Sequence, residues 1–412
     1  MQTKAEVFSK RRENLINSLN ENELVIVFAN EEATGANRFL QNSHFYYFTG
    51  LNTPEAILIM GKANNKGFDE IFIQKNIPER IVWDGEKIWP EQVTDISGIK
   101  TVLFIDDFEK NTVFHLNAFR KIYINCDLVG LNQPLNKALF FIKRAQERVP
   151  HLAFEDISNI IRPLREIKDE TEIEAITESI RITWEGIKLI WKNARPGMME
   201  YELEAMLHFE MQKKGCRNYG FVPIVAAGKN AATLHYVDNN TIIEDNQLVL
   251  LDVGASKNNY SADISRTFPV NGKFTDRQKE VYQEVLNIQK EIIAMVKPGV
   301  SMGDLNKRTR ELMFASMTKL GLITEESEVI KHYMHGIGHH LGLDVHDIGA
   351  RDSVLKEGMV ITVEPGIYIA EEAIGIRIED DVLVTANSHR VLSDFIPKEI
   401  EELERLLQDY RK

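Results

Sequence analysis

The sequence of 412 residues is poor in cysteine, in positive charge and in long apolar runs, and each shortage narrows what the protein can be. Its two cysteines, Cys126 and Cys216, form no Cys-x-x-Cys pair, so no disulfide framework is implied and a reducing cytoplasm is expected. Lysine and arginine number 49 against 62 acids, and the net charge of -13 argues against nucleic acid as a partner. No apolar run approaches the roughly 20 residues that span a bilayer. Residues 1–19 carry charges throughout, so we expect neither a signal peptide nor a membrane segment.

The composition that remains is that of a globular protein with two domains. Hydrophobic residues make up 43% and charged residues 27% of the chain, which leaves little room for large disordered segments. The length suits two domains of ordinary size. The pattern is interrupted around Arg162-Pro163, and a long helix with isoleucines at spacings of three and four follows from Asp169. We therefore expect domains at 1–162 and 163–412.

The first domain has the pattern of a mixed α/β fold. Its apolar spacing predicts helices over 8–19 and 135–148. Short runs rich in β-branched and aromatic residues, separated by turn residues, predict strands over 23–28, 45–49, 56–60, 70–74, 102–105 and 121–125. It contains no phosphate-binding glycine loop and no cluster of metal-ligand residue types.

The second domain contains an internal echo. Pro196-Gly197 and Pro298-Gly299 each follow a basic residue and precede a leucine seven positions after the proline. Farther along, two apolar strands each end in an acid that has a glycine two residues later, and each is followed by a second acid. These four acids are Asp252, Asp263, Glu364 and Glu379. Two echoes in the same order predict two similar halves, each of which supplies two carboxylates.

The acids stand where an unpaired carboxylate is costly. Asp252 follows four apolar residues, and a buried carboxylate costs several kcal/mol unless it is paired or bound to metal. A hairpin between Asp252 and Asp263 would bring both to one site. In the segment GIRIEDDVLV, the two-residue period places Arg377 and Glu379 on one face and the isoleucines on the other. This pattern indicates a polar site between apolar layers.

A dense histidine segment supplies further ligand candidates. His335, His339, His340 and His346 fall within twelve residues, and the first two have the i, i+4 spacing of the zincin HExxH motif. No glutamate follows His335, however, and the glycines at 336 and 338 disfavour a helix. We therefore expect a loop that presents histidines to a site built by strands.

The candidate ligands add up to four carboxylates and one or two imidazoles. Four negative charges balance two divalent cations, which favours a dinuclear centre over a single ion. Ligation by oxygen favours Mn²⁺, with Co²⁺, Fe²⁺ or Zn²⁺ as alternatives. Two ions about 3.5–4 Å apart can share a water, lower its pKa and polarise a carbonyl.

With these residues in place, the chain resembles the pita-bread metallopeptidases, the family of methionine aminopeptidase, prolidase and aminopeptidase P. The resemblance to aminopeptidase P (Xaa-Pro aminopeptidase) extends over nearly the whole length. It is carried by NSHFYYFTG at 42–50 with Pro54-Glu55-Ala56, and by LLDVGA, YSADISRTFPV, HGIGHHLGLDVHD, ITVEPGIYI and GIRIEDDVLVT in order. It implies an α+β chain in which a smaller mixed α/β domain precedes a pita-bread (creatinase/aminopeptidase) fold with pseudo-twofold halves.

The resemblance also implies roles for the candidate residues. Asp263 and Glu379 would bridge the metals, and Glu364 would also accept the proton of the nucleophilic water. His235, His335 and His346 would lie beside the metals, and Arg377 would orient Glu379 or line the product side, whereas His340 is expected to be structural. The implied metal ligands are Asp252, Asp263, His339, Glu364 and Glu379.

The implied activity is cleavage of the bond between an N-terminal residue and a following proline by a hydroxide held between the metals. Expected substrates are therefore peptides with proline at the second position, in a cytoplasmic homo-oligomer (a dimer or tetramer). The alternatives are prolidase, which takes only Xaa-Pro dipeptides, a creatinase-like enzyme, and an inactive pita-bread binding protein. A short loop between Tyr368 and Gly375 leaves contacts to extended substrates open. Trp83 and Trp89 are expected to be core or surface aromatics, with a contribution to a neighbouring subunit's site as the alternative.

Overall fold

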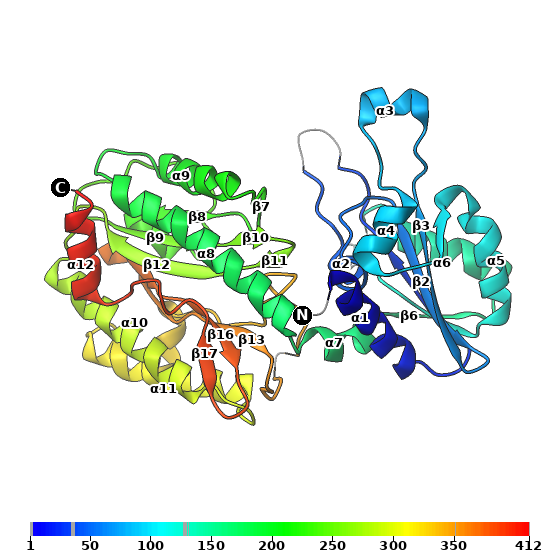
Figure 1. The fold of residues 1–412 in the computed structure, drawn as a ribbon. Coiled ribbons are helices and arrows are strands. Elements are labelled where there is room, and N and C mark those ends of the chain that lie inside the picture. Colours follow the sequence, from blue (N-terminus) through cyan, green and yellow to red (C-terminus); the bar gives the residue numbers. More distant parts are fainter. Residues whose placement is uncertain (1–2, 34–37, 127–129, 131, 351, 412) are drawn as a thin grey trace. The chain divides into compact units, whose positions relative to one another are not determined.

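The computed structural model describes residues 3–33, 38–126, 130, 132–350 and 352–411. The chain divides into two compact units, Met1–Leu164 and Arg165–Lys412 (Figure 1). Within the described residues, no helix is both long enough and apolar enough to cross a membrane.

The first unit is built on one six-stranded sheet with the order β4-β3-β2-β1-β5-β6. Strands β1, β2 and β3 pair antiparallel, whereas β4, β5 and β6 add parallel to their neighbours. The strands are β1 Glu23–Phe28, β2 Ile57–Ala63, β3 Lys66–Ile73, β4 Val102–Phe104, β5 Lys121–Ile124 and β6 Ala153–Asp156. The helices are α1 Lys4–Ser18, α2 Ser43–Thr49, α3 Pro78–Asp84, α4 Pro90–Ser97, α5 Phe108–Ala118, α6 Lys137–Arg148 and α7 Ser158–Arg165.

Most of the elements expected in this unit are present, but the strand predicted over 45–49 is wrong. These residues belong to helix α2, which begins after Asn42, whose side chain accepts hydrogen bonds from the amides of His44 and Phe45. Gly50 ends the helix in the left-handed region at φ 68°. All five residues of 45–49 are buried, so the two-residue alternation of a half-exposed strand is missing. Capping and burial on all sides therefore outweigh the β propensity of the aromatic residues.

The structure places Pro163 and the two tryptophans, Trp83 and Trp89, of the first unit. Pro163 lies inside helix α7, so the interruption seen around Arg162-Pro163 is itself helical. Trp83 is 85% exposed on α3 and Trp89 is 41% exposed just before α4, which excludes a core role for both.

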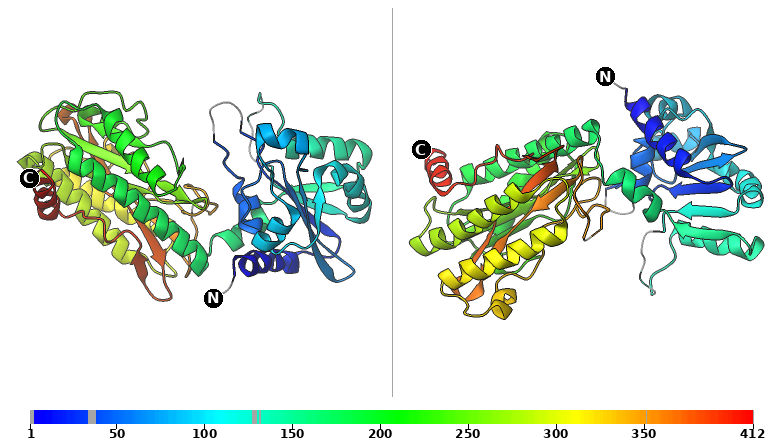
Figure 2. Two further views of the ribbon diagram at one scale, coloured as in Figure 1. Left: turned by 45° about the horizontal axis from the view of Figure 1, so that its top comes forward. Right: turned by 90° about the horizontal axis from the view of Figure 1, so that it is seen from below.

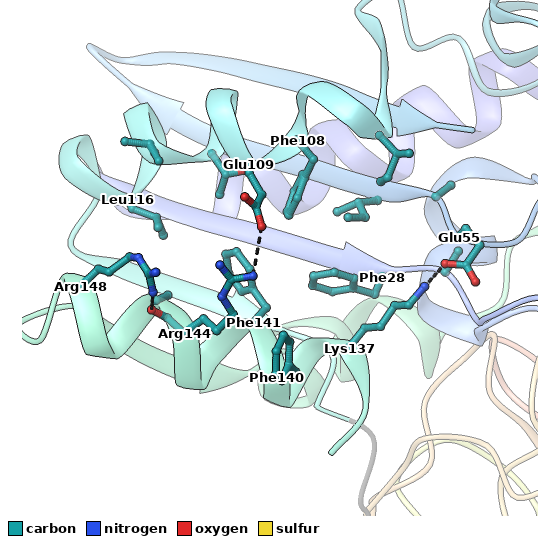
Figure 3. A pocket seen from close by; sticks show the side chains of 17 residues that line it. Phe28, Glu55, Phe108, Glu109, Leu116, Lys137, Phe140, Phe141, Arg144 and Arg148 are labelled. Carbon is teal, nitrogen blue, oxygen red and sulfur yellow. Dashed lines mark hydrogen bonds and ion pairs between the residues drawn. The ribbon is translucent and has the colours of Figure 1, made fainter. Parts of the chain in front are cut away.

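A cavity of about 330 Å³ lies between α5, α6 and the sheet (Figure 3). Its walls are mainly apolar and include Phe28, Phe108 and Phe141. Four of the charged side chains at its edge form two pairs, because Arg144 Nη1 lies 3.1 Å from Glu109 Oε1 and Lys137 pairs with Glu55. The fifth, Arg148, donates to Arg144 O at 3.3 Å.

The second unit packs helices around short sheets (Figures 1 and 2). Its two central sheets have the orders β12-β9-β8 and β13-β16-β17, and β14 and β15 form a hairpin. The helices are α8 Glu170–Asn193, α9 Glu200–Lys213, α10 Asp276–Met295, α11 Met302–Lys319 and α12 Ile400–Asp409. The strands are β7 Asn218–Tyr219, β8 Ile224–Ala227, β9 Leu248–Val253, β10 Ala255–Lys257, β11 Tyr260–Ser261, β12 Ile264–Pro269, β13 Val360–Val363, β14 Gly366–Ile369, β15 Ile374–Arg377, β16 Asp380–Val384 and β17 His389–Val391.

The internal echo corresponds to two similarly built halves. Gly197 has φ 92° and donates its N–H to Ile243 O at 2.8 Å. Gly299 has φ 90° and donates to Leu355 O at 3.0 Å. Each glycine stands between a long helix (α8 or α10) and a second helix (α9 or α11), and its positive φ is a conformation that other residues rarely adopt. The repeated Pro-Gly therefore marks the same turn in both halves.

We predict that Asn42→Ala lowers the free energy of unfolding of the first unit by about 1 kcal/mol, because two amide donors of α2 lose their acceptor. Asn42→Asp keeps an acceptor at this position and serves as the matched control. Urea unfolding of the full chain, followed by circular dichroism, measures both. An unchanged midpoint for Asn42→Ala would show that the cap does not stabilise the helix.

Candidate metal centre

The first pair of acids lies on two antiparallel strands. Asp252 is the penultimate residue of β9, and Asp263 immediately precedes β12. The two strands pair with Asp252 opposite Ser265. The predicted hairpin-like return is present, although the short strands β10 and β11 occupy the connection. The two carboxylates are thereby brought to the same end of the sheet.

The second pair repeats this arrangement in the other half. Glu364 directly follows β13 and Glu379 directly precedes β16. These strands are antiparallel, with Val363 opposite Asp380, and the β14–β15 hairpin lies in the connection. The two halves meet here, because Glu379 N–H donates to Ser265 O at 3.1 Å.

The histidine segment contains no helix, which confirms that it is not a zincin motif. It lies along β13 instead: His339 N–H donates to Thr362 Oγ1 at 3.1 Å, and Thr362 N–H donates to His339 O at 2.9 Å. A Cβ on Gly338 would lie 2.0 Å from Thr362 O, so only glycine permits this approach. The glycine that argued against a helix in the sequence therefore allows the loop to dock.

All the candidate site residues line one cavity of about 350 Å³. His339 Nε2 lies 3.4 Å from Asp263 Oδ2 and 3.6 Å from Glu364 Oε1. Ligand atoms of Asp263, His339 and Glu379 all lie within 4.8 Å of one another. The candidates that line this cavity are His235, Asp252, Asp263, His335, His339, His346, Glu364, Arg377 and Glu379.

The ring of His339 is oriented as a metal ligand. Its Nδ1 lies 3.0 Å from His340 O, a carbonyl that can only accept, so Nδ1 carries the hydrogen and Nε2 faces the acids with a free lone pair. Burial lowers the pKa of His339 to about 4, so the imidazole is neutral at pH 7. Neutral imidazole is the form that binds a divalent ion.

The carboxylates are close enough to oppose one another's ionisation. Burial, followed by the charge of Glu379, raises the pKa of Asp263 well above its ordinary value. Burial, followed by the charge of Glu364, does the same to the pKa of Glu379. Burial raises the pKa of Glu364 to about 8, against the lowering effect of Arg377. Asp252 Oδ1 is buried without a hydrogen-bond partner among the described residues. Divalent cations would satisfy this oxygen and neutralise the cluster.

The guanidinium group of Arg377 connects two of the candidate ligands through hydrogen bonds. Its Nη2 lies 2.5 Å from Asp252 Oδ2, and its Nη1 donates to the Tyr368 hydroxyl at 2.8 Å. Its Nε donates to Ser265 Oγ at 2.9 Å, and Ser265 Oγ donates to Glu379 Oε2 at 2.8 Å. Arg377 therefore contacts Asp252 directly and reaches Glu379 only through Ser265.

The other histidines take different positions. His235 and His346 are exposed at the cavity, and the ring of His346 is centred 4.3 Å from that of His339. Both nitrogens of His335 have partners, since Nδ1 lies 2.8 Å from Gly336 O and Nε2 lies 2.8 Å from the Tyr368 hydroxyl. His340 is buried and bonds Ser353 Oγ outside the cavity, in agreement with the structural role expected for it.

Sequence reasoning missed several residues that support the ligands. Tyr368 and Ser265 are recognisable only once Arg377 is placed between them. Asp380 and Asp381 carried a signal, because two further acids follow Glu379 within one apolar strand. Both are completely buried, and burial raises the pKa of Asp381 well above its ordinary value.

Comparison with known proteins identifies the architecture. Residues 8–123 match the aminopeptidase P N-terminal domain, and residues 174–386 match metallopeptidase family M24. The chain belongs to metallopeptidase family M24. Within this family, it is 32% identical to the Xaa-Pro aminopeptidase of Escherichia coli K12, over 98% of both chains.

Solved structures of M24 members agree with this placement along the whole chain. A Bacillus anthracis structure assigned provisionally to aminopeptidase P has a TM-score of 0.96 and 41% identity, with 99% of each chain covered. The low-pH form of E. coli aminopeptidase P has a TM-score of 0.91 and 30% identity, with 100% of each chain covered. The expected pita-bread fold with a preceding smaller domain is therefore confirmed.

We predict that the stabilisation of the protein by Mn²⁺ increases with pH between about 5.5 and 8.5. The pKa of Glu364 is about 8 in the folded metal-free protein against an ordinary 4.5, so the folded state binds this proton more tightly than the unfolded chain. That contribution to stability is present at low pH and is lost as pH rises towards 8, whereas a bound ion replaces the proton. At a free ion concentration of about 100 Kd, the gain is about 2.7 kcal/mol.

The measurement compares the Tm in EDTA with the Tm in Mn²⁺ across this pH range. Glu364→Gln is the comparison variant: it removes one titrating group and one candidate ligand together, so both the stabilisation by Mn²⁺ and its increase with pH are expected to become smaller. A Tm difference that is independent of pH in the unaltered protein would contradict the expected exchange of protons for metal.

Proposed function

We propose that this protein is a Xaa-Pro aminopeptidase, which removes the N-terminal residue of peptides that have proline in second position. The observation that carries this proposal is the convergence of four acids and His339 at one cavity, in a chain that resembles the E. coli enzyme over its whole length. Apolar side chains of Phe221, Val222 and Val345 line the same cavity and offer surface to an apolar residue of the substrate.

The proposed metal ligands are Asp252, Asp263, His339, Glu364 and Glu379, which together would hold two divalent ions, and Asp263 and Glu379 would serve both ions. The unpartnered Asp252 oxygen and the mutual repulsion of the acids support this assignment. The oxygen-rich ligand set favours Mn²⁺. When bound, the ions would polarise the scissile carbonyl and lower the pKa of a shared water.

Glu364 is the proposed proton carrier. Its side chain is 18% exposed at the cavity, so the carboxylate can reach both water and substrate. We propose that it accepts the proton of the nucleophilic water and delivers it to the nitrogen of the departing proline.

His235 and His346 are the proposed donors to the developing oxyanion. Both face the cavity, and neither imidazole has a protein hydrogen-bond partner in the part of the chain described. A donor of this kind contributes ~3 kcal/mol to transition-state stabilisation. His335 is better suited to shaping the pocket, because both of its ring nitrogens are engaged. Arg377 holds Asp252 and, through Ser265, Glu379.

We propose that the protein works in the cytoplasm and forms a homo-oligomer. The two free cysteines support a reducing compartment, and the net charge of -13 supports solubility. The exposed indole of Trp83 is available to a neighbouring subunit.

Asp263→Asn is expected to reduce turnover of a Xaa-Pro-Xaa tripeptide at least ~100-fold, because a proposed bridging ligand loses its charge. Metal content, measured on the same sample, is expected to fall in parallel. Asp276→Asn, an exposed acid at the start of α10, is the matched control and is expected to retain full activity. Unchanged turnover by Asp263→Asn would remove this residue from the centre.

Substrate length separates the proposal from prolidase. We expect kcat/KM for a Xaa-Pro-Xaa tripeptide to exceed that for the corresponding Xaa-Pro dipeptide by at least ~10-fold, because residues beyond proline add binding energy in the cavity. The same tripeptide with alanine in place of proline is the control for proline recognition. Exclusive cleavage of the dipeptide would assign the protein to prolidase instead.

A further inference from the structure

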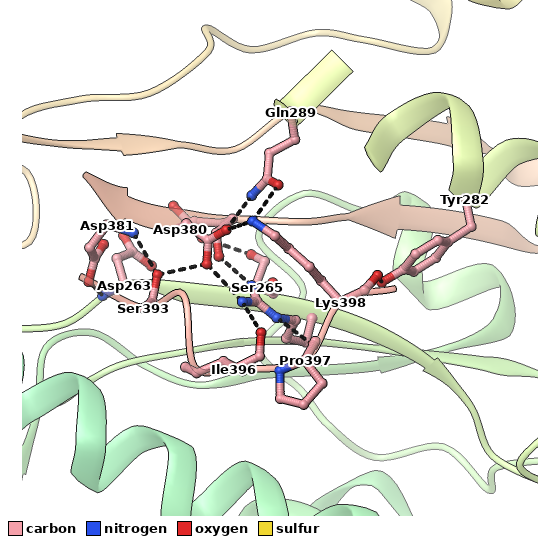
Figure 4. Close-up of polar contacts among 12 residues, drawn as sticks. Asp263, Ser265, Tyr282, Gln289, Asp380, Asp381, Ser393, Ile396, Pro397 and Lys398 are labelled. Atoms are coloured by element: carbon pink, nitrogen blue, oxygen red, sulfur yellow. Dashed lines mark hydrogen bonds and ion pairs between the residues drawn. The ribbon is translucent and has the colours of Figure 1, made fainter. Parts of the chain in front are cut away.

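A second cluster of charges is buried directly behind the metal centre (Figure 4). Its centre is Asp380, which is completely buried and pairs with two cations. Arg266 Nη2 lies 2.7 Å from Asp380 Oδ1, and Lys398 pairs with Asp380 Oδ2. Gln289 Nε2 also donates to Asp380 Oδ2, at 2.8 Å. These residues do not line the cavity, so they have no direct role in binding substrate.

The Arg266 guanidinium ties together the two strands that carry the proposed bridging ligands. Its Nη1 donates to Ser265 O on β12 at 2.9 Å and to Glu379 O, just before β16, at 2.5 Å. Nη2 donates to Ile396 O, and Nε to Pro397 O, each at 3.1 Å. Together with Asp380, these carbonyls provide five acceptors for the five N–H groups. A lysine has three donors in a different geometry and cannot make the same set.

Asp381 makes a second hydrogen-bonded connection, to the main chain of Asp263. Its Oδ2 accepts the backbone N–H of Asp263 at 3.2 Å. Its own N–H donates to Ser393 Oγ at 3.2 Å, and Ser393 Oγ donates to Asp380 Oδ1 at 2.7 Å. The backbone of Asp263 is thereby linked through Asp381 and Ser393 to the same buried acid that holds Arg266.

Stability alone is a weak reason for such a cluster. Burying an ion pair costs desolvation energy that is roughly cancelled by the attraction, and apolar residues of similar volume are often as stabilising. The contacts have one feature that apolar packing could not reproduce, namely directed bonds to the main chain at Glu379 and Asp263. Two ions about 3.5–4 Å apart demand a fixed spacing of the carboxylates between them.

We propose that Arg266 and Asp381 are positioning residues that fix the separation of Asp263 and Glu379 and thereby set the affinity of the centre for its second ion. Arg266 joins the two strands, and Asp381 holds the main chain at the first of the two ligands. The inference rests on the dinuclear centre of the proposed function.

The first experiment compares Arg266→Lys with Lys398→Met in the full chain. Arg266→Lys keeps a positive charge beside Asp380 but cannot maintain the bonds to both strands. Lys398→Met is the matched control, because it removes the other cation of Asp380, and among the described residues Lys398 Nζ donates to the side chains of Asp380 and Gln289 and to no main-chain atom beside Asp263 or Glu379. Calorimetric titration with Mn²⁺ gives stoichiometry and affinity, and the electron paramagnetic resonance spectrum reports the spin-coupled Mn²⁺ pair.

Arg266→Lys is expected to weaken the second Mn²⁺ by ~10–100-fold and to diminish the spin-coupled signal, as is typical when an outer partner of a ligand is lost. Lys398→Met is expected to bind two ions with affinities within ~3-fold of the unaltered protein, whatever the change in its Tm. The proposal is overturned if Arg266→Lys binds both ions normally, or if Lys398→Met loses the second ion to the same extent.

The second experiment separates the bond made by Asp381 from its charge. Asp381→Ala removes the acceptor of the Asp263 N–H and is expected to weaken the second ion by ~10-fold or more. Asp381→Asn retains an oxygen of the same shape and is expected to restore the affinity and the coupled signal. Failure of Asn to restore what Ala removes would overturn the positioning role of Asp381.

The titration of the unaltered protein keeps this inference distinct from the proposed function. If the unaltered protein binds two Mn²⁺ per chain and the Arg266 and Asp381 variants bind the second ion with unchanged affinity, the positioning role is contradicted and the dinuclear centre is not. A single Mn²⁺ per chain in the unaltered protein would contradict the dinuclear centre itself, and with it the role assigned here.

Discussion

Mutual repulsion among four carboxylates that line one cavity is the constraint on which the second unit depends. Asp263 and Glu379 are almost completely buried. Burial and the charge of Glu379 raise the pKa of Asp263, and burial and the charge of Glu364 raise the pKa of Glu379. A protein can hold such a cluster only by keeping some of the acids protonated or by supplying cations, either bound ions or its own side chains. Arg377 and Ser265 answer this constraint, because Arg377 pairs with Asp252 and Ser265 donates a hydrogen bond to Glu379.

The two arginines that support the ligands lie at different distances from the cavity. Arg377 lies beside the cavity and bonds Asp252, whereas Arg266 lies behind the ligand strands and bonds main-chain carbonyls and Asp380. The first can therefore adjust the charge of a ligand, and the second can adjust only the position of the strands. Because the two arginines occupy different positions, the three consecutive acids from Glu379 to Asp381 can all be buried and still have different roles. Successive residues of a strand point to opposite faces, so Asp380 points away from the ligand beside it.

The repeated arrangement of the two halves explains how the four acids come together. In each half, one acid lies at the end of a strand or just after it, a short connection follows, and a second acid immediately precedes the antiparallel partner strand. Antiparallel pairing alone places the two acids of each half together. Contact between β12 and the residues just before β16, through Ser265 and Glu379, then brings the two pairs together. The histidine loop joins the second half by docking on β13, where Gly338 leaves room for it.

The sequence by itself determined the class of the protein and most of its candidate site residues. Acids at the ends of apolar strands are costly unless they bind something, so Asp252 and Glu364 could be singled out by position alone, and glycines 336 and 338 excluded a helical zinc motif. Local reasoning failed at residues 45–49, where the aromatic residues favour a strand but capping by Asn42 and burial on all sides produce a helix. Only the tertiary structure decided which partners orient the ligands. Ser265, Arg266 and Asp381 acquire their roles from contacts with segments more than a hundred residues away, and no local pattern encodes such pairings. Tyr368 meets Arg377 across the β14–β15 hairpin, and its role depends on where Arg377 is held.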